Sequence, residues 1–213
     1  MLTIETFTFN PYQENTYLLI DQEGNCVIID PGMHSLQEQS YFKDFIVNNN
    51  LKPTLLLNTH CHIDHVLGNH FIHENWGLKP NFHEFEVPVL VSVENYAPQM
   101  GFRYATSPIP ETFLQDKEII EFGGHKIEAI FAPGHSPGHL CYYIADQKIL
   151  IGGDVLFQNS IGRTDLPGGD HQTLLDSIKN RIYTLPEDVE VYPGHGPTTT
   201  IGFEKKTNPF VRG

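Results

Sequence analysis

The chain has 213 residues, 39% of them hydrophobic, with 18 glycines and 15 prolines, a composition typical of a folded, turn-rich protein with one large core. Its formal net charge of −13 comes from 26 acidic and 13 basic side chains. This charge argues against a nucleic-acid partner, because binding to a phosphate backbone needs a cationic surface. We expect a single domain over residues 1–213.

The chain shows no targeting or membrane signal. Residues 1–5 lack the basic and apolar segments of a signal peptide, and no apolar run approaches the length of a membrane span. The three cysteines, Cys26, Cys61 and Cys141, have no paired spacing. We therefore expect reduced thiols, no membrane partner and a cytoplasmic location.

The first half of the chain alternates apolar strands with turn and helix signals. Ser35 and Glu38 have the spacing of a capping box. Phe42, Phe45 and Ile46 follow at helical spacing, which predicts a helix over 36–49. The other predicted elements of this half are strands at 2–9, 17–20, 26–29 and 55–58 and helices at 68–75 and 84–96.

The second half repeats this style. One face of a helix predicted over 172–183 carries Leu174, Leu175, Ile178 and Ile182. The remaining predictions are strands at 118–122, 126–131, 141–144, 149–151 and 189–192 and a short helix near 201. Two sheet-rich halves, each flanked by helices, predict a four-layer α/β/β/α sandwich.

Four side chains of the kind that bind metals crowd into six residues behind the apolar run 55–57: His60, His62, Asp64 and His65. Burying them so close together is unfavourable without a cation to share, and zinc and related divalent metals accept these ligands. His60 and His62 point to the same side of an extended chain, whereas Asp64 and His65 fall where the chain must turn. The layout favours two neighbouring metals.

Three further candidate ligands each follow a predicted strand and a glycine: His135, Asp154 and His195. A lone histidine after a strand is most often structural, but here the pattern of strand, tight turn and ligand recurs. Strand ends joined by loops are where α/β proteins assemble sites from distant segments, and glycine leaves room beside the ligand.

The motif from His60 to His65, together with His135, Asp154 and His195, resembles the ligand set of the metallo-β-lactamase superfamily over essentially the whole chain. Within it, residues 15–17, 133–139 and 153–157 resemble the glyoxalase II (hydroxyacylglutathione hydrolase) branch. The ending over 193–210 is similar to short bacterial members that lack the C-terminal helical segment.

The resemblance implies an enzyme with a dinuclear site and the same sandwich fold. It assigns His60, His62 and His135 to one metal, Asp64, His65 and His195 to the other, and Asp154 to both. The cofactors are two divalent metal ions, with zinc favoured over iron or manganese. A bridging hydroxide then attacks a small-molecule acyl thioester of the hydroxyacylglutathione type, with Asp64 and Asp154 as the catalytic carboxylates and Asp64 orienting the water.

Two alternatives stay open. Residues 162–165, Gly-Arg-Thr-Asp, also resemble persulfide dioxygenases, in which the equivalents of His60, His135 and Asp154 hold a single iron. The third hypothesis is a non-catalytic member that binds metal. The presence of all ligands for a second metal favours the hydrolase.

Several residues near the motif have more than one interpretation. Arg163 is a candidate substrate contact, and an internal salt bridge is an equally good interpretation. Cys61 is predicted to be a core thiol, and His139 to orient a metal ligand rather than bind the metal. His70 and His73 are read as ordinary helix residues.

Overall fold

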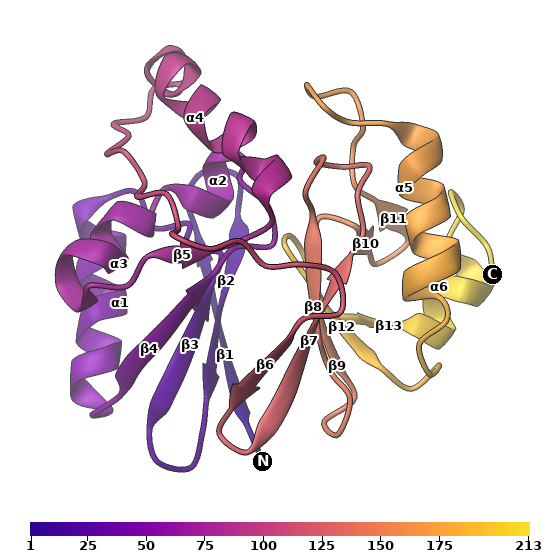
Figure 1. Cartoon of the computed structure of the whole chain (residues 1–213), viewed down its shortest axis with the longest axis horizontal. Coiled ribbons are helices and arrows are strands. Elements are labelled where there is room, and N and C mark those ends of the chain that lie inside the picture. The colour runs from indigo at the N-terminus through magenta and orange to yellow at the C-terminus, as the bar shows by residue number, and fades with distance from the viewer. The chain divides into compact units, whose positions relative to one another are not determined.

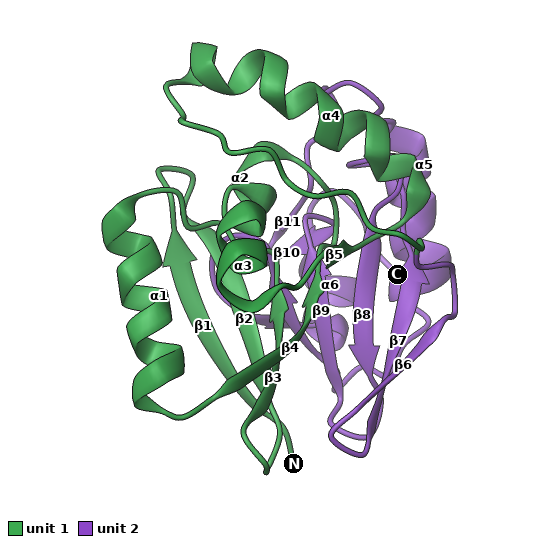
Figure 2. Ribbon diagram, turned by 60° about the vertical axis from the view of Figure 1, so that its left-hand side comes forward, with its two compact units in different colours: residues 1–113 green, residues 114–213 purple.

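Two separate β-sheets organise the chain, one in each half. The structure is a computed structural model that describes residues 1–213. The chain divides into two compact units, Met1–Phe113 and Leu114–Gly213, coloured separately in Figure 2. This division matches the two sheet-rich halves expected from the sequence, whereas a single domain over 1–213 stays a prediction.

The sheet of the first unit has five strands in the order β1-β2-β3-β4-β5. β1 (Thr3–Phe9), β2 (Glu14–Ile20) and β3 (Asn25–Ile29) form an antiparallel meander. β4 (Lys52–Leu57) and the edge strand β5 (Pro80–Asn81) then join in parallel. Because Ile29 pairs with Leu57, β3 and β4 end at the same edge of the sheet, and the residues that follow them are neighbours.

Helices cover one face of this sheet, as Figure 1 shows for α1 (Leu36–Asn48) and α3 (Asn69–Trp76). α1 begins at the predicted capping box: the Ser35 side chain accepts from the Glu38 N–H, and Glu38 reaches back to the Ser35 N–H. Phe42 and Ile46 of α1 and Ile72 of α3 pack in one apolar cluster with side chains of β1 to β4. Burial of these apolar side chains, rather than the intrinsic helix propensity of the exposed residues, stabilises the helices.

Further helices pack together in the first unit, one before β5 in the chain and one after it. The short helix α2 (Ile63–Val66) and α4 (Val87–Tyr96) share an apolar cluster that includes Val66, Leu90 and Val93. The predicted helix over 84–96 is in fact two pieces, a 3₁₀ turn η1 (Glu84–Glu86) and then α4, and a second 3₁₀ turn η2 (Ala97–Met100) follows. Pro88 stands in the first turn of α4, where a missing N–H does no harm.

The sheet of the second unit has six strands in the order β13-β12-β9-β8-β7-β6. The strands β6 to β9 are antiparallel, and β12 joins β9 in parallel. Their bounds are β6 Ile119–Phe122, β7 His125–Phe131, β8 Leu140–Ile144, β9 Ile149–Gly153, β12 Glu190–Pro193 and β13 Thr199–Thr200, and a separate hairpin joins β10 Leu156–Phe157 to β11 Ser160–Ile161.

One face of the second sheet packs against helical segments. α5 (His171–Ser177) continues as a π-helical turn η3 (Ile178–Ile182), and α6 (Ile201–Thr207) follows β13. The predicted helix over 172–183 is therefore α-helical only in its first half. Leu174, Ile178 and Ile182 still lie on the buried face, as predicted, in one cluster with side chains of β7, β8, β9 and β12.

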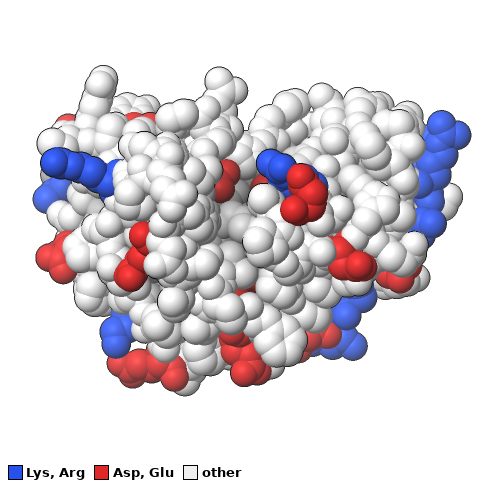
Figure 3. All heavy atoms as spheres, turned by 90° about the horizontal axis from the view of Figure 1, so that it is seen from above, with Lys and Arg blue, Asp and Glu red and all other residues white.

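No helix of the structure is both long and apolar enough to cross a membrane. On the face drawn in Figure 3, Lys and Arg side chains lie in separate small groups with Asp and Glu among them.

Candidate metal centre

The first unit presents a group of three imidazoles just beyond the end of β4. The ring of His60 lies 4.8 Å from that of His62 and 4.1 Å from that of His65, measured between centroids. All three side chains are buried. The chain is irregular up to His62, where α2 begins, so the predicted turn at Asp64 and His65 is the first turn of a helix. His65 Nε2 lies 3.7 Å from Asp64 Oδ2.

Asp30, the residue directly after β3, holds this group in place. Its Oδ1 accepts a hydrogen bond from the Thr59 N–H at 2.7 Å, and its Oδ2 accepts from the Thr59 hydroxyl at 2.6 Å and from His65 Nδ1 at 3.1 Å. Because the Thr59 hydroxyl donates to Asp30, it accepts from His60 Nδ1, which lies 3.0 Å away. Both imidazoles thus carry their proton on Nδ1, which leaves the Nε2 lone pairs available to a metal.

Sequence reasoning missed Asp30 and treated residues 30–32 only as the end of a strand. The available signal was an acidic residue directly after a buried strand, at the same sheet edge as the histidines. Asp30 also has φ of 50°, a left-handed conformation that few residues other than glycine, asparagine and aspartate adopt. Asp30 is therefore a positioning residue for the predicted ligands.

Glu14 is a second buried acid in this region, with no exposed surface. Its Oε2 accepts a hydrogen bond from the Thr16 hydroxyl at 2.9 Å, and its Oε1 lies 4.0 Å from His65 Nδ1. Burial raises the pKa of the Glu14 carboxyl well above its usual range, although His65 opposes the shift. The first unit therefore surrounds His65 with two buried carboxyl groups.

The second unit brings the other three predicted ligands to one end of its sheet. Asp154 follows β9, and its Oδ2 lies 3.5 Å from His135 Nε2 and 3.6 Å from His195 Nε2. These distances are too long for good hydrogen bonds. They are close to the separation of roughly 3.3 Å that two ligands have when each binds one tetrahedral ion at about 2.0–2.1 Å. The three side chains are thus spaced as ligands.

Main-chain groups orient these ligands. His135 Nδ1 donates to the Arg163 carbonyl at 2.7 Å. His135 therefore carries its proton on Nδ1, as His60 and His65 do, and its Nε2 is left as an acceptor. His139 Nε2 accepts from the Asp154 N–H at 3.1 Å, in agreement with the predicted positioning role. The Arg163 side chain makes two contacts of 2.7 Å with Asp165, the internal salt bridge that the sequence left as an alternative.

The main chain at Gly162 passes close to this group, which leads to a prediction. A Cβ atom at Gly162 would lie 1.9 Å from the Asp154 carbonyl oxygen and 3.1 Å from His135 Nδ1. Gly162→Ala is therefore expected to displace Asp154, to lower the free energy of unfolding by about 1–3 kcal/mol and to weaken metal binding at least about tenfold. Metal titration and thermal unfolding measure both effects.

The matched control is Gly124→Ala, in the turn between β6 and β7. Gly124 has φ of 80° but no atom within reach of an added Cβ, so this change introduces backbone strain alone, at about 1 kcal/mol. Unaltered metal affinity in Gly162→Ala would contradict the role given to this close approach.

The donor set of both units fits divalent metal ions. It combines neutral imidazoles with carboxylates that bring negative charge to a buried place. The Nδ1 atoms of His60, His65 and His135 each have a defined hydrogen-bond partner. Imidazole and carboxylate ligands accept zinc, iron and manganese alike, so the donor types do not select among these metals.

Other residues considered in the sequence have structural roles. Cys61 lies in the apolar cluster of α2 and α4, and burial raises the pKa of its thiol well above the usual range. All three cysteines are buried free thiols. His70 and His73 lie on α3 and contact the carbonyls of Thr106 and Leu78. The core and helix interpretations of these residues are confirmed.

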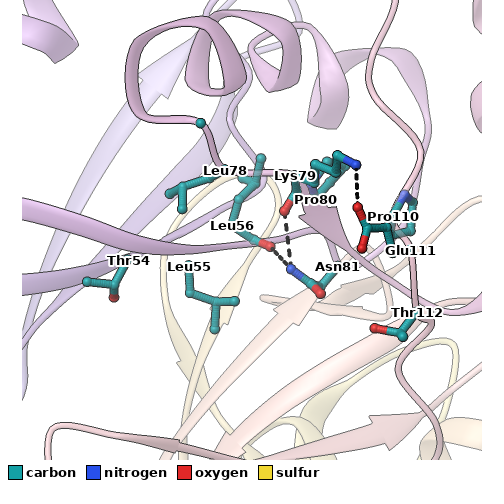
Figure 4. A pocket seen from close by; sticks show the side chains of 11 residues that line it. Thr54, Leu55, Leu56, Leu78, Lys79, Pro80, Asn81, Pro110, Glu111 and Thr112 are labelled. Atoms are coloured by element: carbon teal, nitrogen blue, oxygen red, sulfur yellow. Dashed lines mark hydrogen bonds and ion pairs between the residues drawn. The ribbon is translucent and has the colours of Figure 1, made fainter.

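A separate open cavity of about 380 Å³ lies at the β5 edge of the first sheet. Figure 4 shows its wall, where Asn81 Nδ2 donates to the Leu56 carbonyl and Lys79 pairs with Glu111 at 2.8 Å. None of the predicted metal ligands lines this cavity. It is therefore distinct from the metal centre.

Comparisons with known proteins agree with the site. The Metallo-beta-lactamase superfamily profile matches residues 9–195. The chain is 37% identical over 216 residues to "Hydroxyacylglutathione hydrolase GloC" of Haemophilus influenzae, covering 99% of this chain and 98% of that protein. Two solved structures are similar: BLEG-1 B3 metallo-beta-lactamase, with a TM-score of 0.90, 35% identity and coverage of 99% and 100%, and TTHA1623 in a di-iron-bound form, with a TM-score of 0.86, 36% identity and coverage of 97% and 100%.

The fold and the paired imidazole and carboxylate groups define a metallohydrolase. The chain belongs to the metallo-β-lactamase superfamily, and its likeness to a hydroxyacylglutathione hydrolase agrees with a glyoxalase II-like branch. The fold class predicted from the sequence is confirmed.

Proposed function

We propose that this protein hydrolyses small acyl thioesters with two divalent metal ions, as hydroxyacylglutathione hydrolases do. The observation that carries the proposal is the spacing of His135 and His195 around one oxygen of Asp154, 3.5 and 3.6 Å from it. The Asp154 carboxylate lies between two imidazoles, and neither is within normal hydrogen-bond distance of it. This arrangement suits a carboxylate ligand that is shared between ions.

The residues proposed to hold the metals are those expected from the family pattern. By that pattern His60, His62 and His135 would hold the first ion, Asp64, His65 and His195 would hold the second, and both ions would share Asp154. The defined tautomers of His60, His65 and His135 support this assignment, because each leaves Nε2 as an acceptor.

When bound, the two ions supply an activated water and a Lewis acid for the substrate carbonyl. Asp64 accepts a hydrogen bond from this water and orients it toward the acyl carbon. One water proton passes to solvent, a bond forms between the water oxygen and the acyl carbon, and the C–S bond breaks to give the carboxylic acid while the sulfur leaves with its electron pair. A thiolate has a conjugate acid with a pKa of about 8.5, so it leaves without a dedicated acid from the protein.

The finer features of the proposal follow the same family pattern. Zinc is the proposed metal, the location is cytoplasmic, and no nucleic acid or membrane takes part. The substrate is of the hydroxyacylglutathione type. The Arg163 side chain is paired with Asp165. If Arg163 contributes to substrate binding, as proposed, its guanidinium must therefore leave Asp165 or contact Asp165 and the substrate together.

Release of thiol from S-lactoylglutathione tests the function. The metal-loaded protein is expected to hydrolyse this thioester, to lose the activity when a chelator removes the metal, and to regain it when zinc is restored. Two metal ions per chain are expected by elemental analysis. Hydrolysis that persists in both His62→Ala and Asp64→Ala would refute the dinuclear mechanism.

A second candidate is a persulfide dioxygenase with one iron, which the Gly162–Asp165 stretch favours. In this stretch the Arg163 carbonyl orients His135, one of the ligands that such an enzyme needs. Oxygen uptake with glutathione persulfide and one iron per chain would establish this candidate. Bound metal without turnover of thioesters, β-lactams or persulfides would instead indicate a non-catalytic member.

A further inference from the structure

An aromatic cluster in the first unit lies outside the predicted ligand set. The ring of Phe102 stacks with that of Tyr12 at 5.8 Å between centroids and 30° between planes, and it meets His34 edge-on at 5.4 Å. These residues come from the turn between β1 and β2, the loop between β3 and α1, and the segment after η2. Three distant segments thus converge on one ring.

The turn that carries Tyr12 is held in one conformation. Asn10 and Gln13, on either side of it, have φ of 52° and 56°, a left-handed conformation that asparagine tolerates but that is unfavourable for glutamine. The Tyr12 N–H donates to Asn10 Oδ1 at 3.0 Å, and the Gln13 N–H donates to the Asn10 carbonyl at 3.1 Å. Glu38 of α1 accepts from the Asn10 N–H at 2.8 Å. Such over-determined strain is common at ligand-binding sites.

The same turn is tied to a predicted metal ligand. Asn10 Nδ2 donates to the carbonyl of Asp64 at 3.1 Å and to that of Gly32 at 3.0 Å. Tyr96 of α4 lies near both parts: burial raises the pKa of its phenol to about 12, and the nearby Asp64 and Tyr12 add to the rise. Tyr12 and Asp64 are therefore neighbours on one rigid support.

The outer ring of this cluster is exposed to solvent. Phe102 is only 7% exposed, but Tyr12, which covers it, is 42% exposed. An exposed aromatic ring on a turn that is hydrogen-bonded through Asn10 to the main chain of Asp64 is suited to contact an apolar group of a bound substrate.

We propose that Tyr12, supported by Phe102, recognises the acyl group of the substrate and selects thioesters whose acyl part carries an aromatic or bulky apolar substituent. This inference rests on the proposed thioester hydrolysis and adds a specificity-determining residue to it. Aromatic contacts of this type are strong enough to change the preference between two substrates about fivefold to tenfold.

Two substrates that differ at one group provide the test. S-Mandeloylglutathione carries a phenyl group where S-lactoylglutathione carries a methyl group, with the same thiol. In Tyr12→Ala the ratio of kcat/KM for the mandeloyl to the lactoyl substrate is expected to fall about fivefold to tenfold. Tyr12→Phe keeps the ring and is expected to keep the ratio.

Tyr41→Ala is the matched control, since Tyr41 is 60% exposed and also contacts a phenylalanine ring, that of Phe7. Its ratio is expected to stay that of the unchanged protein. An unchanged ratio in Tyr12→Ala would overturn the inference while leaving thioester hydrolysis intact.

Binding of the free acids separates this inference from the function it rests on. Titration calorimetry of the zinc-loaded protein is expected to show tighter binding of mandelate than of lactate, with the difference lost in Tyr12→Ala. If neither thioester is hydrolysed, the proposed function fails, and this binding preference decides the role of Tyr12. Equal binding of the two acids, or a preference that survives Tyr12→Ala, would then refute the role of Tyr12 in recognising the acyl group.

Discussion

Replacing Asp154 by asparagine is expected to lower kcat/KM for thioester hydrolysis on the order of a thousandfold or more, because a shared ligand loses its charge. The Asp154 carboxylate lies between His135 and His195, and an amide of the same size keeps the shape but binds divalent cations far more weakly. Metal content is expected to fall below two ions per chain. Elemental analysis and steady-state kinetics measure the two effects.

The variant is not expected to unfold. Without metal, removal of a largely buried charge relieves desolvation, so thermal unfolding of the metal-free protein is expected to stay the same or to shift upward. Asp188→Asn is the control, since that exposed carboxylate pairs with Lys148. Full activity in Asp154→Asn with two bound ions would contradict the assignment of Asp154.

Asp30→Asn is expected to weaken metal binding about tenfold to a hundredfold, although Asp30 is not a proposed ligand. Its two oxygens accept from the Thr59 N–H, the Thr59 hydroxyl and His65 Nδ1. An amide can accept with only one of its two atoms, so its NH₂ group would face one of these donors. His65 would then lose its orientation or its Nδ1 proton.

The effect of Asp30→Asn should appear in the metal-free protein as well, as a loss of about 3–5 kcal/mol in the free energy of unfolding, the range for breaking a buried charged network. Asparagine tolerates the left-handed backbone at this position, so the loss does not come from strain. Asp21→Asn, in the turn between β2 and β3, is the control, because Asp21 is a partly exposed acid that also accepts backbone hydrogen bonds. Unchanged zinc affinity in Asp30→Asn would show that Asp30 does not position the ligands.

Much of the fold was predictable because the signals are local. The capping box at Ser35 and Glu38 predicted where α1 begins, and the apolar side chains of α5 and η3 were placed on the correct face. The strands β5, β10, β11 and β13 were missed because each has only two residues, too few to show an alternating pattern. The change from α-helix to π-helix after Ser177 was missed because residue types do not encode it.

Local spacing was also sufficient to propose the metal ligands. The seven candidates lie close together in sequence or follow a strand and a glycine, and the chemistry of imidazole and carboxylate limits what they can bind. The sequence thus determined the family of the protein and predicted the kind of metal centre, because these depend on side-chain chemistry at short range.

The groups that orient those ligands became visible only in the folded chain. Asp30 meets His65 across 35 residues because β3 and β4 end at the same sheet edge, and His135 meets the carbonyl of Arg163 across 28 residues. Asn10 joins the turn carrying Tyr12 to Asp64 across 54 residues. These contacts depend on the packing of strands and loops and involve main-chain atoms that every residue has, so no residue pattern announces them.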